Sequence, residues 1–570
     1  MTTPATVSPD RTDVPAGADA YLLLRAFCDE LARCGMRHAC TSPGSRCTPI
    51  VLSLVREQRI RCFSHIDERC AGFFALGAAK ASGRPVAVTC TSGTAAANLA
   101  PAVIEAHQAG VPMIVLTADR PPELREVGAG QTIDQLKLYG NAVKWFFDVG
   151  VQEATVERVR WMRTLACRTY GTALADRPGP VHLNFPLREP LVVESPLPDD
   201  PVPGRGDGTP WVRRVSAAST AAQGPGPHPS GKIAVVAGGG TDNPEALARF
   251  CAEKRIPLLA DPLSGARRGP AAVAHYDLIL RDCAFAEGHR PEFLIRAGEL
   301  PTSKPLRAWL AGLDVAQIAV DPHGTWRDPD GVVGTRIGAL PLPEDLEPVD
   351  AGWLANWREA DDRAEEAIVG VLADELSEPL TAREVPRALG ADATLYLASS
   401  MPIRDAELFI PTRANPPRVL SNRGANGIDG TVSSAFGASA VSEGPVVLLT
   451  GDVAVAHDVG GLLAARRLGL RLTIVLLNND GGGIFHFLPI ASEGEAFVEH
   501  VATPHGLDFS RAAALYGCGY ERPAAVGELQ AALERALDAQ NSTIIEVRTD
   551  RERNLALHRR VAEAVQAALN

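Results

Sequence analysis

The chain has 570 residues, a formal net charge of −12 and 46% hydrophobic residues. One hydrophobic core does not extend over this length, so we expect several domains. The acidic balance disfavours nucleic acid or an anionic membrane surface as a partner. No apolar run approaches the roughly 18 residues of a membrane-spanning helix. The composition indicates a globular protein, which we expect in the cytoplasm.

Residues 1–17 lack the basic start and apolar core of a secretion signal, so we expect a flexible tail there. The eleven cysteines include no Cys-x-x-Cys pair, and several stand inside expected helices or strands. Buried thiols are therefore favoured over disulfides or a zinc site.

A first α/β domain is expected over residues 18–194, with strands near 39–41, 61–66, 86–91, 113–117 and 181–184. Glu68 stands directly before a helix expected over 70–82. A carboxylate at a helix N-terminus is normally stabilised in its charged form, so Glu68 taken alone indicates a helix cap. The Pro- and Gly-rich residues 195–230 are expected to form a linker.

A central domain is expected over residues 231–345. It opens with KIAVVAGGGTDNPEALARF, which is typical of a strand, a glycine turn and a helix. The full dinucleotide fingerprint is missing, so structural packing is favoured over a nucleotide site. Residues 346–379 should form a helical connection, with an amphipathic helix over 353–376.

The third domain, residues 380–570, contains the most informative pattern, VVLLTGD followed by RLTIVLLNNDGGG. Two apolar strands each end in polar residues, and a helix is expected between them over 457–469. This strand–helix–strand unit predicts parallel neighbours, with Asp452 and Asn479 at their carboxyl ends. Oxygen ligands at such an edge suit Mg²⁺ and a phosphate group, and the following glycines let backbone approach it. Either half alone more simply indicates an ordinary turn.

The two halves together resemble the cofactor signature of thiamine-diphosphate enzymes. In that family a glutamate near the N-terminus activates the aminopyrimidine ring, and Glu68 is the candidate here. The segments TSPGSRCTPI, TADRPPELREVGAGQTIDQ, LPTSK, SSMPIRD, SNRGANGIDGTVSSAFG and NNDGGGIFHFLP narrow the match. They resemble the 2-succinyl-5-enolpyruvyl-6-hydroxy-3-cyclohexene-1-carboxylate synthases of menaquinone biosynthesis, in the same order along the chain.

That resemblance implies decarboxylation of 2-oxoglutarate and 1,4-addition of the succinyl carbanion equivalent to isochorismate, with thiamine diphosphate and Mg²⁺ or Mn²⁺. Another thiamine-diphosphate carboligase, such as an acetohydroxyacid synthase, is the alternative, but pyruvate would not need so many cationic positions. A non-catalytic protein that kept the fold is a further alternative. The presence of Glu68, Asp452 and Asn479 argues against it.

The resemblance also implies a set of site residues. The metal ligands would be Asp452, Asn479 and Gly481, and the cofactor would contact Glu68, Met401, Ile428, Gly451 and Ala454. Substrate contacts would come from Ser45, Arg46, Arg120, Gln131, Lys304, Ser400, Arg404, Arg423, Ile484 and Phe485. Arginine suits the substrates because its fork binds carboxylates bidentately, although each cation taken singly indicates a solvated surface charge. Some relatives carry a second basic residue where this chain has Pro305, which leaves one carboxylate contact in doubt.

The fold implied is α/β, with three doubly wound and mostly parallel-sheet domains. The first and third would have the thiamine-diphosphate-binding fold, and the middle one would be like a nucleotide-binding fold. A homodimer or dimer of dimers with shared active sites is expected, with no nucleic-acid partner and no membrane insertion.

Overall fold

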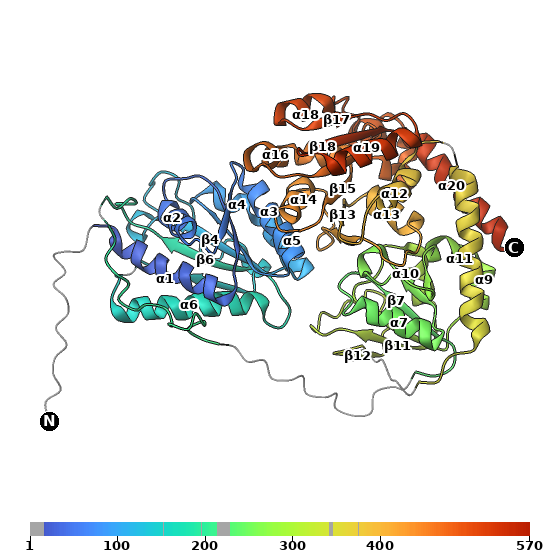
Figure 1. Cartoon of the computed structure of the whole chain (residues 1–570), viewed down its shortest axis with the longest axis horizontal. Helices are drawn as coiled ribbons and strands as arrows, with labels where there is room; N and C mark the ends of the chain where they lie inside the picture. Colours follow the sequence, from blue (N-terminus) through green and yellow to red (C-terminus); the bar gives the residue numbers. More distant parts are fainter. Residues whose placement is uncertain (1–15, 152, 195, 214–228, 341–345, 374) are drawn as a thin grey trace. The chain divides into compact units, whose positions relative to one another are not determined.

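A computed structural model describes residues 16–151, 153–194, 196–213, 229–340, 346–373 and 375–570. The chain divides into two compact units, Met1–Ser216 and Ala217–Asn570 (Figure 1). Residues 1–15 of the expected N-terminal tail lie outside the described residues. Within the described part of the chain, no helix combines the length and the apolar character needed to cross a membrane.

The first unit is a parallel sheet with helices on both faces. Its strand order is β2-β1-β3-β4-β6-β5. The strands are β1 (His38–Thr41), β2 (Arg61–Ser64), β3 (Val86–Cys90), β4 (Met113–Asp119), β5 (Trp145–Asp148) and β6 (Val181–Pro186). One face packs on α1 (Ala18–Cys34), α2 (Thr48–Arg56) and α6 (Val156–Leu174). The other carries α3 (Glu68–Ser82), α4 (Thr94–Asn98) and α5 (Ala100–Ala109).

Strand β5 was not predicted. Its four residues are all half-buried, so they show neither the alternation of a half-exposed strand nor the full burial of a central one. The strand lies at the edge of the sheet and pairs only with β6. An edge position leaves little trace in a hydrophobic pattern.

The central sheet opens the second unit. Its order is β12-β11-β10-β7-β8-β9, the doubly wound order of nucleotide-binding folds. The strands are β7 (Ile233–Ala237), β8 (Leu258–Ala260), β9 (Ala272–Val273), β10 (Phe293–Ala297), β11 (Ala316–Val320) and β12 (Thr335–Ile337). The helices are α7 (Pro244–Lys254), α8 (Tyr276–Ile279), α9 (Cys283–Gly288) and α10 (Lys304–Ala311). The predicted strand, glycine turn and helix are confirmed by β7 and α7.

The third sheet, also in the second unit, has the order β14-β13-β15-β16-β18-β17, and all its pairs are parallel. Counted from its own first strand, this is the strand order of the first unit. The strands are β13 (Thr394–Leu397), β14 (Arg418–Ser421), β15 (Val446–Gly451), β16 (Thr473–Asn478), β17 (Gly519–Glu521) and β18 (Thr543–Arg548). The predicted fold class is therefore confirmed, including the shared fold of the first and third sheets.

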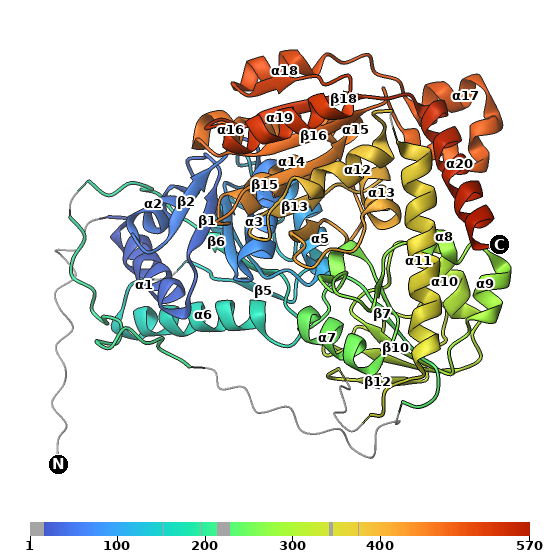
Figure 2. The same ribbon diagram turned by 45° about the vertical axis from the view of Figure 1, so that its right-hand side comes forward.

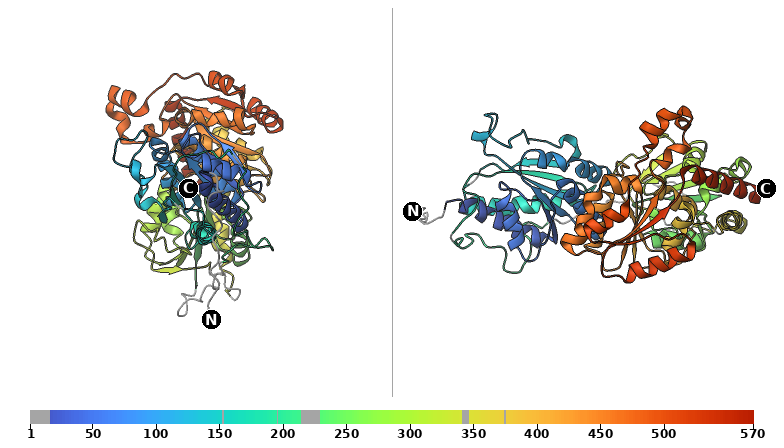
Figure 3. Two further views of the ribbon diagram at one scale, coloured as in Figure 1. Left: turned by 90° about the vertical axis from the view of Figure 1, so that its left-hand side faces the viewer. Right: turned by 90° about the horizontal axis from the view of Figure 1, so that it is seen from above.

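Helices of the third sheet complete the second unit. They are α12 (Glu378–Arg387), α13 (Met401–Phe409), α14 (Thr431–Ser439), α15 (Asp452–His457), α16 (Leu463–Leu468), α17 (Glu495–Phe497), α18 (Phe509–Tyr516), α19 (Val526–Asp538) and α20 (Arg551–Leu569). The predicted connecting helix is α11 (Ala351–Leu372), which buries Trp353 and Trp357 in the core of the central sheet. It lies along α20 in Figure 2, and Figure 3 shows the layers from two further directions.

The single helix predicted over 457–469 is wrong. The crossover contains α15, a 3₁₀ turn at Val459–Leu462, and α16. The helix ends before Asp458, whose carboxylate accepts hydrogen bonds from the backbone amide and the hydroxyl of Ser433, at 2.7 and 2.9 Å. This contact on α14 stabilises the break, and Gly460 and Gly461 lower the cost of leaving the helix.

The expected linker is described only over 196–213 and from 229 onward; residues 195 and 214–228 lie outside the described residues. Its first part contacts the first unit. The Arg163 Nε donates to the Val202 carbonyl at 2.8 Å, and the Trp211 amide donates to Glu30 at 2.5 Å. These bonds hold residues 196–213 against α1 and α6, so this part of the stretch is not a free spacer.

Candidate active site

The most polar edge of the third sheet lies where β15 and β16 end. The two strands are parallel neighbours, with Gly451 opposite Leu477, as the sequence predicted. Asp452 follows as the first residue of α15 and is only 2% exposed. Its carboxylate accepts a hydrogen bond from the Gly481 amide at 3.0 Å. This bond brings the loop after β16 against the end of β15.

Asn479 presents a free acceptor at this edge. Its Nδ2 donates to Glu378 Oε1 at 2.9 Å, whereas its Oδ1 is buried and has no hydrogen-bond partner among the described residues. Glu378 is buried at the start of α12, and its Oε1 also accepts a bond from the Thr549 hydroxyl at 2.8 Å. The carboxylate therefore fixes the amide with its nitrogen toward Glu378 and its oxygen free. A buried, unpaired carbonyl oxygen is costly unless something binds it.

Gly481 lets the loop approach the neighbouring backbone closely. Its φ is 139°, and a methyl group there would lie 2.2 Å from the Ala502 carbonyl oxygen. Any side chain would therefore push this turn away from the Asp452 carboxylate. The next amide, of Gly482, donates to the same Ala502 oxygen at 2.7 Å.

This donor group fits a hard divalent cation. It consists of the Asp452 carboxylate, the free amide oxygen of Asn479 and the carbonyl of Gly481, which are oxygen ligands of the kind Mg²⁺ prefers. Burial raises the pKa of Asp452 above its usual value, and a bound cation would counter that effect. His505 Nε2 lies 3.3 Å from the Asp452 carboxylate, a contact that the sequence analysis missed because nothing around His505 marks it.

Four of the predicted cofactor contacts belong to the second unit. Met401 and Ala454 are buried, Gly451 ends β15, and Ile428 is half-buried in the loop before α14. Ile484 and Phe485 lie in a 3₁₀ turn directly after the glycine loop. Phe485 is 37% exposed, so an apolar ring faces outward beside the polar loop.

Two arginines of the second unit lie on neighbouring strand ends. Arg404, on α13, donates to the carbonyl of Ser400 at 2.5 Å, and burial lowers the pKa of its guanidinium. Arg423 donates to the hydroxyls of Ser399 and Thr302, at 3.2 and 3.4 Å. Ser400 has a φ of 75°, a strained backbone of the kind found at binding sites.

Lys304 is the first residue of α10 and is exposed. It lies two residues after Thr302, which contacts Arg423. The loop that carries Lys304 therefore meets Arg423, and the central and third sheets contribute to one cationic region. The fold thus brings the loop before Lys304 to Arg423, two of the predicted positions in this unit. Ser399 and Thr302 join them as hydrogen-bond partners that the sequence analysis did not name.

Glu68 belongs to the first unit, as the first residue of α3. The helix is capped by Asp67, whose carboxylate accepts from the Arg69 amide at 2.8 Å. The interpretation of Glu68 as the helix-capping residue is therefore wrong, because Asp67 caps the helix. Burial raises the pKa of Glu68 above its usual value, which suits a carboxyl that exchanges a proton.

Arg46 and Arg120 form a second cationic region, in the first unit. Arg46 is 7% exposed and donates to the Leu187 carbonyl at 2.8 Å and to Glu189 at 3.1 Å. Its Nε is buried and has no hydrogen-bond partner in the part of the chain that the structure describes. Burial and the positive charge of Arg46 both lower the pKa of Arg120. Two partly desolvated guanidiniums that repel each other favour an anion between them.

Ser92 connects the remaining predicted groups of this region. Arg120 donates to its hydroxyl, the hydroxyl donates to the Gln131 carbonyl at 2.9 Å, and the Gln131 side chain returns a bond to the Ser92 carbonyl at 3.0 Å. Ser45 is exposed in the loop after β1. The sequence analysis missed Ser92, although its position directly after β3 carries the same signal as the other site loops.

Both cationic regions and the Asp452 edge belong to a chain with clear relatives among known proteins. Residues 23–138 match the thiamine pyrophosphate enzyme N-terminal TPP binding domain, and residues 404–547 match the C-terminal one. A 2-succinyl-5-enolpyruvyl-6-hydroxy-3-cyclohexene-1-carboxylate synthase of Halobacterium salinarum is 42% identical over 95% of this chain and 98% of its own.

The chain belongs to this synthase family. Synthases with the same name from Geobacillus thermodenitrificans and Listeria monocytogenes are 42% and 41% identical, each over 95% of this chain, and over 95% and 98% of their own lengths. The predicted family and the predicted thiamine diphosphate cofactor are confirmed. The individual site residues and the metal stay predictions.

Replacing Gly481 with Ala should displace the loop after β16. The added carbon meets the Ala502 carbonyl, and the positive φ adds strain of about 1–3 kcal/mol. We expect a lower free energy of unfolding and weaker binding of thiamine diphosphate, measured by chemical denaturation and calorimetry. Gly527→Ala on α19 is the matched control, since its new methyl meets nothing within 4 Å. Equal effects of the two variants would contradict this account of the loop.

Replacing Glu378 with Leu should release the Asn479 amide, because its nitrogen loses the acceptor that orients it. Residues that orient a metal ligand typically contribute roughly 10–100-fold to metal affinity. We expect the Mg²⁺ concentration needed for half-maximal binding of thiamine diphosphate to rise by about that factor. Glu378→Gln keeps an acceptor oxygen and should restore most of the affinity. An unchanged Mg²⁺ requirement in a folded Glu378→Leu variant would rule out this role.

Proposed function

We propose that this chain decarboxylates 2-oxoglutarate and adds the resulting succinyl group to isochorismate in a 1,4 sense. The products would be 2-succinyl-5-enolpyruvyl-6-hydroxy-3-cyclohexene-1-carboxylate and CO₂. The observation that carries the proposal is the 42% identity over 95% of the chain to synthases of that name. Mass analysis of the product formed from the two substrates, with thiamine diphosphate and Mg²⁺, tests it directly. A pyruvate-derived product instead would favour an acetohydroxyacid synthase.

The cofactor would be held in the second unit. Asp452, Asn479 and the Gly481 carbonyl would bind Mg²⁺ or Mn²⁺, and the metal would carry the diphosphate. Thiamine diphosphate, when bound, supplies the nucleophilic carbon and accepts the electron pair that CO₂ leaves behind. Ile428 would support the cofactor, and Ile484 and Phe485 would exclude water beside it. The support for this assignment is the free oxygen of Asn479 and the narrow turn at Gly481.

Glu68 would hold a proton at the pyrimidine ring nitrogen. Its raised pKa allows the carboxyl to share that proton rather than remain permanently ionised. The cationic residues would bind the substrate carboxylates. Arg404, Ser400 and Lys304 would hold the succinyl arm, and Arg46, Arg120, Gln131, Ser45 and Arg423 would face the acceptor. Both substrates are dianions, and the two cationic regions provide the charge that an acidic chain otherwise lacks.

The Glu68→Gln variant should bind thiamine diphosphate but turn over about two or more orders of magnitude more slowly, because an amide cannot exchange the proton. Product formation under saturating cofactor measures this. Asp67→Asn is the control next to it in the chain, since asparagine also caps helices well and should leave turnover near normal. A Glu68→Gln enzyme as fast as the parent would exclude the assignment.

Arg404→Ala and Arg120→Ala should fail at different stages. Loss of Arg404 should abolish CO₂ release from 2-oxoglutarate, whereas loss of Arg120 should permit one release per site and block product formation. Truncating one partner of a buried charge pair commonly costs about 2–5 kcal/mol, which is ample to resolve by counting CO₂ in a single turnover. Arg511→Ala is the control, because Arg511 is exposed on α18. Normal CO₂ release by Arg404→Ala would overturn the division.

A complete site is proposed to need two subunits, as a homodimer or a dimer of dimers. Glu68 and Asp452 belong to different units of the chain. The family resemblance implies that the two residues of one active site come from different subunits. Inactive Glu68→Gln and Asp452→Ala chains, mixed after dissociation and reassociation, should then regain part of the activity, since some sites receive both intact residues. Proven subunit exchange without any recovered activity would place the whole site in one chain.

A further inference from the structure

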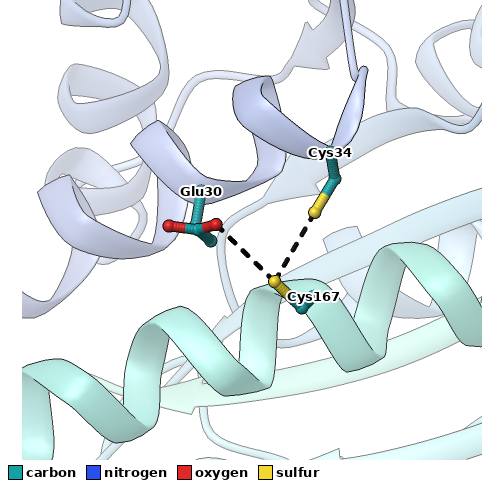
Figure 4. A group of neighbouring side chains, drawn as sticks. All are labelled: Glu30, Cys34 and Cys167. Carbon is teal, nitrogen blue, oxygen red and sulfur yellow. Dashed lines mark hydrogen bonds between the residues drawn. The ribbon is translucent and has the colours of Figure 1, made fainter. Parts of the chain in front are cut away.

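Two helices of the first unit place a carboxylate and two thiols in one small group. Glu30 and Cys34 lie on α1, and Cys167 lies on α6 (Figure 4). The Cys34 and Cys167 sulfurs are 3.7 Å apart, and the Cys167 sulfur is 3.6 Å from Glu30 Oε1. One ligand atom from each residue lies within 4.8 Å of the other two.

We propose that Glu30, Cys34 and Cys167 bind a divalent metal ion of the zinc class. Zn–S bonds of about 2.3 Å and Zn–O bonds of about 2.0–2.2 Å in a tetrahedron separate two sulfurs by roughly 3.8 Å and a sulfur from an oxygen by roughly 3.5–3.7 Å. Two observed separations, 3.7 and 3.6 Å, match these values, and the Cys34 sulfur lies within 4.8 Å of a Glu30 carboxylate oxygen. Cys34 is only half-buried, so a water molecule can complete the coordination.

Backbone donors already support two of the ligands as anions. The Val212 amide donates to the Cys167 sulfur at 3.4 Å, and the Trp211 amide donates to Glu30 Oε1 at 2.5 Å. Bonds of this kind orient metal ligands and stabilise their charged forms.

Binding of a divalent ion leaves the net charge of this buried group unchanged. The Glu30 carboxylate is fully buried and pairs with Arg163 Nη1 at 2.9 Å, and Arg163 also pairs with Asp29 and Asp200, so three carboxylates share its positive charge before any metal arrives. When the ion binds, each thiol loses its proton to solvent and forms a bond to the metal. Two protons therefore leave the group and one doubly charged ion enters it. The net charge of the buried group is unchanged, and binding carries no added penalty for a buried net charge.

The ion would join α1, α6 and the segment at Trp211–Val212 on the face of the sheet opposite α3. Because Glu68 opens α3 on the other face, the metal should stabilise the first unit without changing the chemistry. Metal binding to the folded form alone raises thermal stability by mass action.

Titration of the full-length, reduced and metal-stripped protein with Co²⁺, in excess Mg²⁺, tests the proposal. We expect one equivalent to give thiolate-to-cobalt charge-transfer absorption, displacement by Zn²⁺, release of about two protons per ion, and a higher melting temperature with Zn²⁺. Cys34→Ser and Cys167→Ser should lose the absorption. Cys283→Ser should keep it, because Cys283 is an exposed thiol outside the group.

Alkylation of the parent protein gives a second measurement that needs no variant. Zn²⁺ should protect Cys34 and Cys167 from a thiol reagent and leave Cys283 reactive. The absence of a cobalt–thiolate band in the reduced parent protein, or a band that survives in Cys167→Ser, would overturn the proposal. So would equal labelling with and without Zn²⁺, or isolation of the two cysteines as a disulfide that, once reduced, binds no cobalt.

Discussion

The hydrogen bond from the Gly481 amide to the Asp452 carboxylate joins the ends of two parallel strands, and the geometry of this edge, where the cofactor is proposed to bind, depends on it. Parallel pairing of β15 and β16 sets the two chain segments side by side. The bond then draws the glycine turn inward until only a hydrogen atom fits beside the Ala502 carbonyl. Glu378 completes the arrangement from behind by turning the Asn479 amide oxygen away from its own carboxylate. A buried carboxyl group thus orients the Asn479 amide, which is proposed as a neutral metal ligand.

Concentration of positive charge is the second constraint, because the chain as a whole is acidic. Arg46 and Arg120 lie close enough for the charge of one to lower the pKa of the other, and Arg404 and Arg423 lie near neighbouring strand ends of the other unit. Arg120, Arg404 and Arg423 donate to neutral oxygens such as the carbonyl of Ser400, whereas Arg46 donates to the Leu187 carbonyl and also pairs with the Glu189 carboxylate. Neutral acceptors position a guanidinium without cancelling its charge, so the charge stays available for carboxylates.

The first and third sheets share one strand order although their sequences differ. In both, the functional side chains follow the strands, because the carboxyl ends of parallel strands meet at one edge and the strands themselves are buried. The opposite face of the first sheet, under α1 and α6, carries the Glu30, Cys34 and Cys167 group. The proposed catalytic residue Glu68 and the proposed metal site therefore lie on opposite faces of the first sheet.

Local sequence pattern determined a large part of this protein. Apolar runs that end in polar or glycine residues predicted five strands of the first sheet together with β7, β15 and β16, and placed Asp452 and Asn479 at strand ends, because buried strands and exposed loops differ in local composition. Tertiary structure decided whatever depends on partners distant in the chain. The break in the helix after β15 follows from Ser433, the orientation of Asn479 from Glu378, and the capping at α3 from Asp67 rather than Glu68. Cys34 and Cys167 are 133 residues apart, so no short spacing motif predicts their contact. Packing between helices and strands determines these long-range contacts. The hydrophobic pattern of one segment does not specify which other segment packs against it.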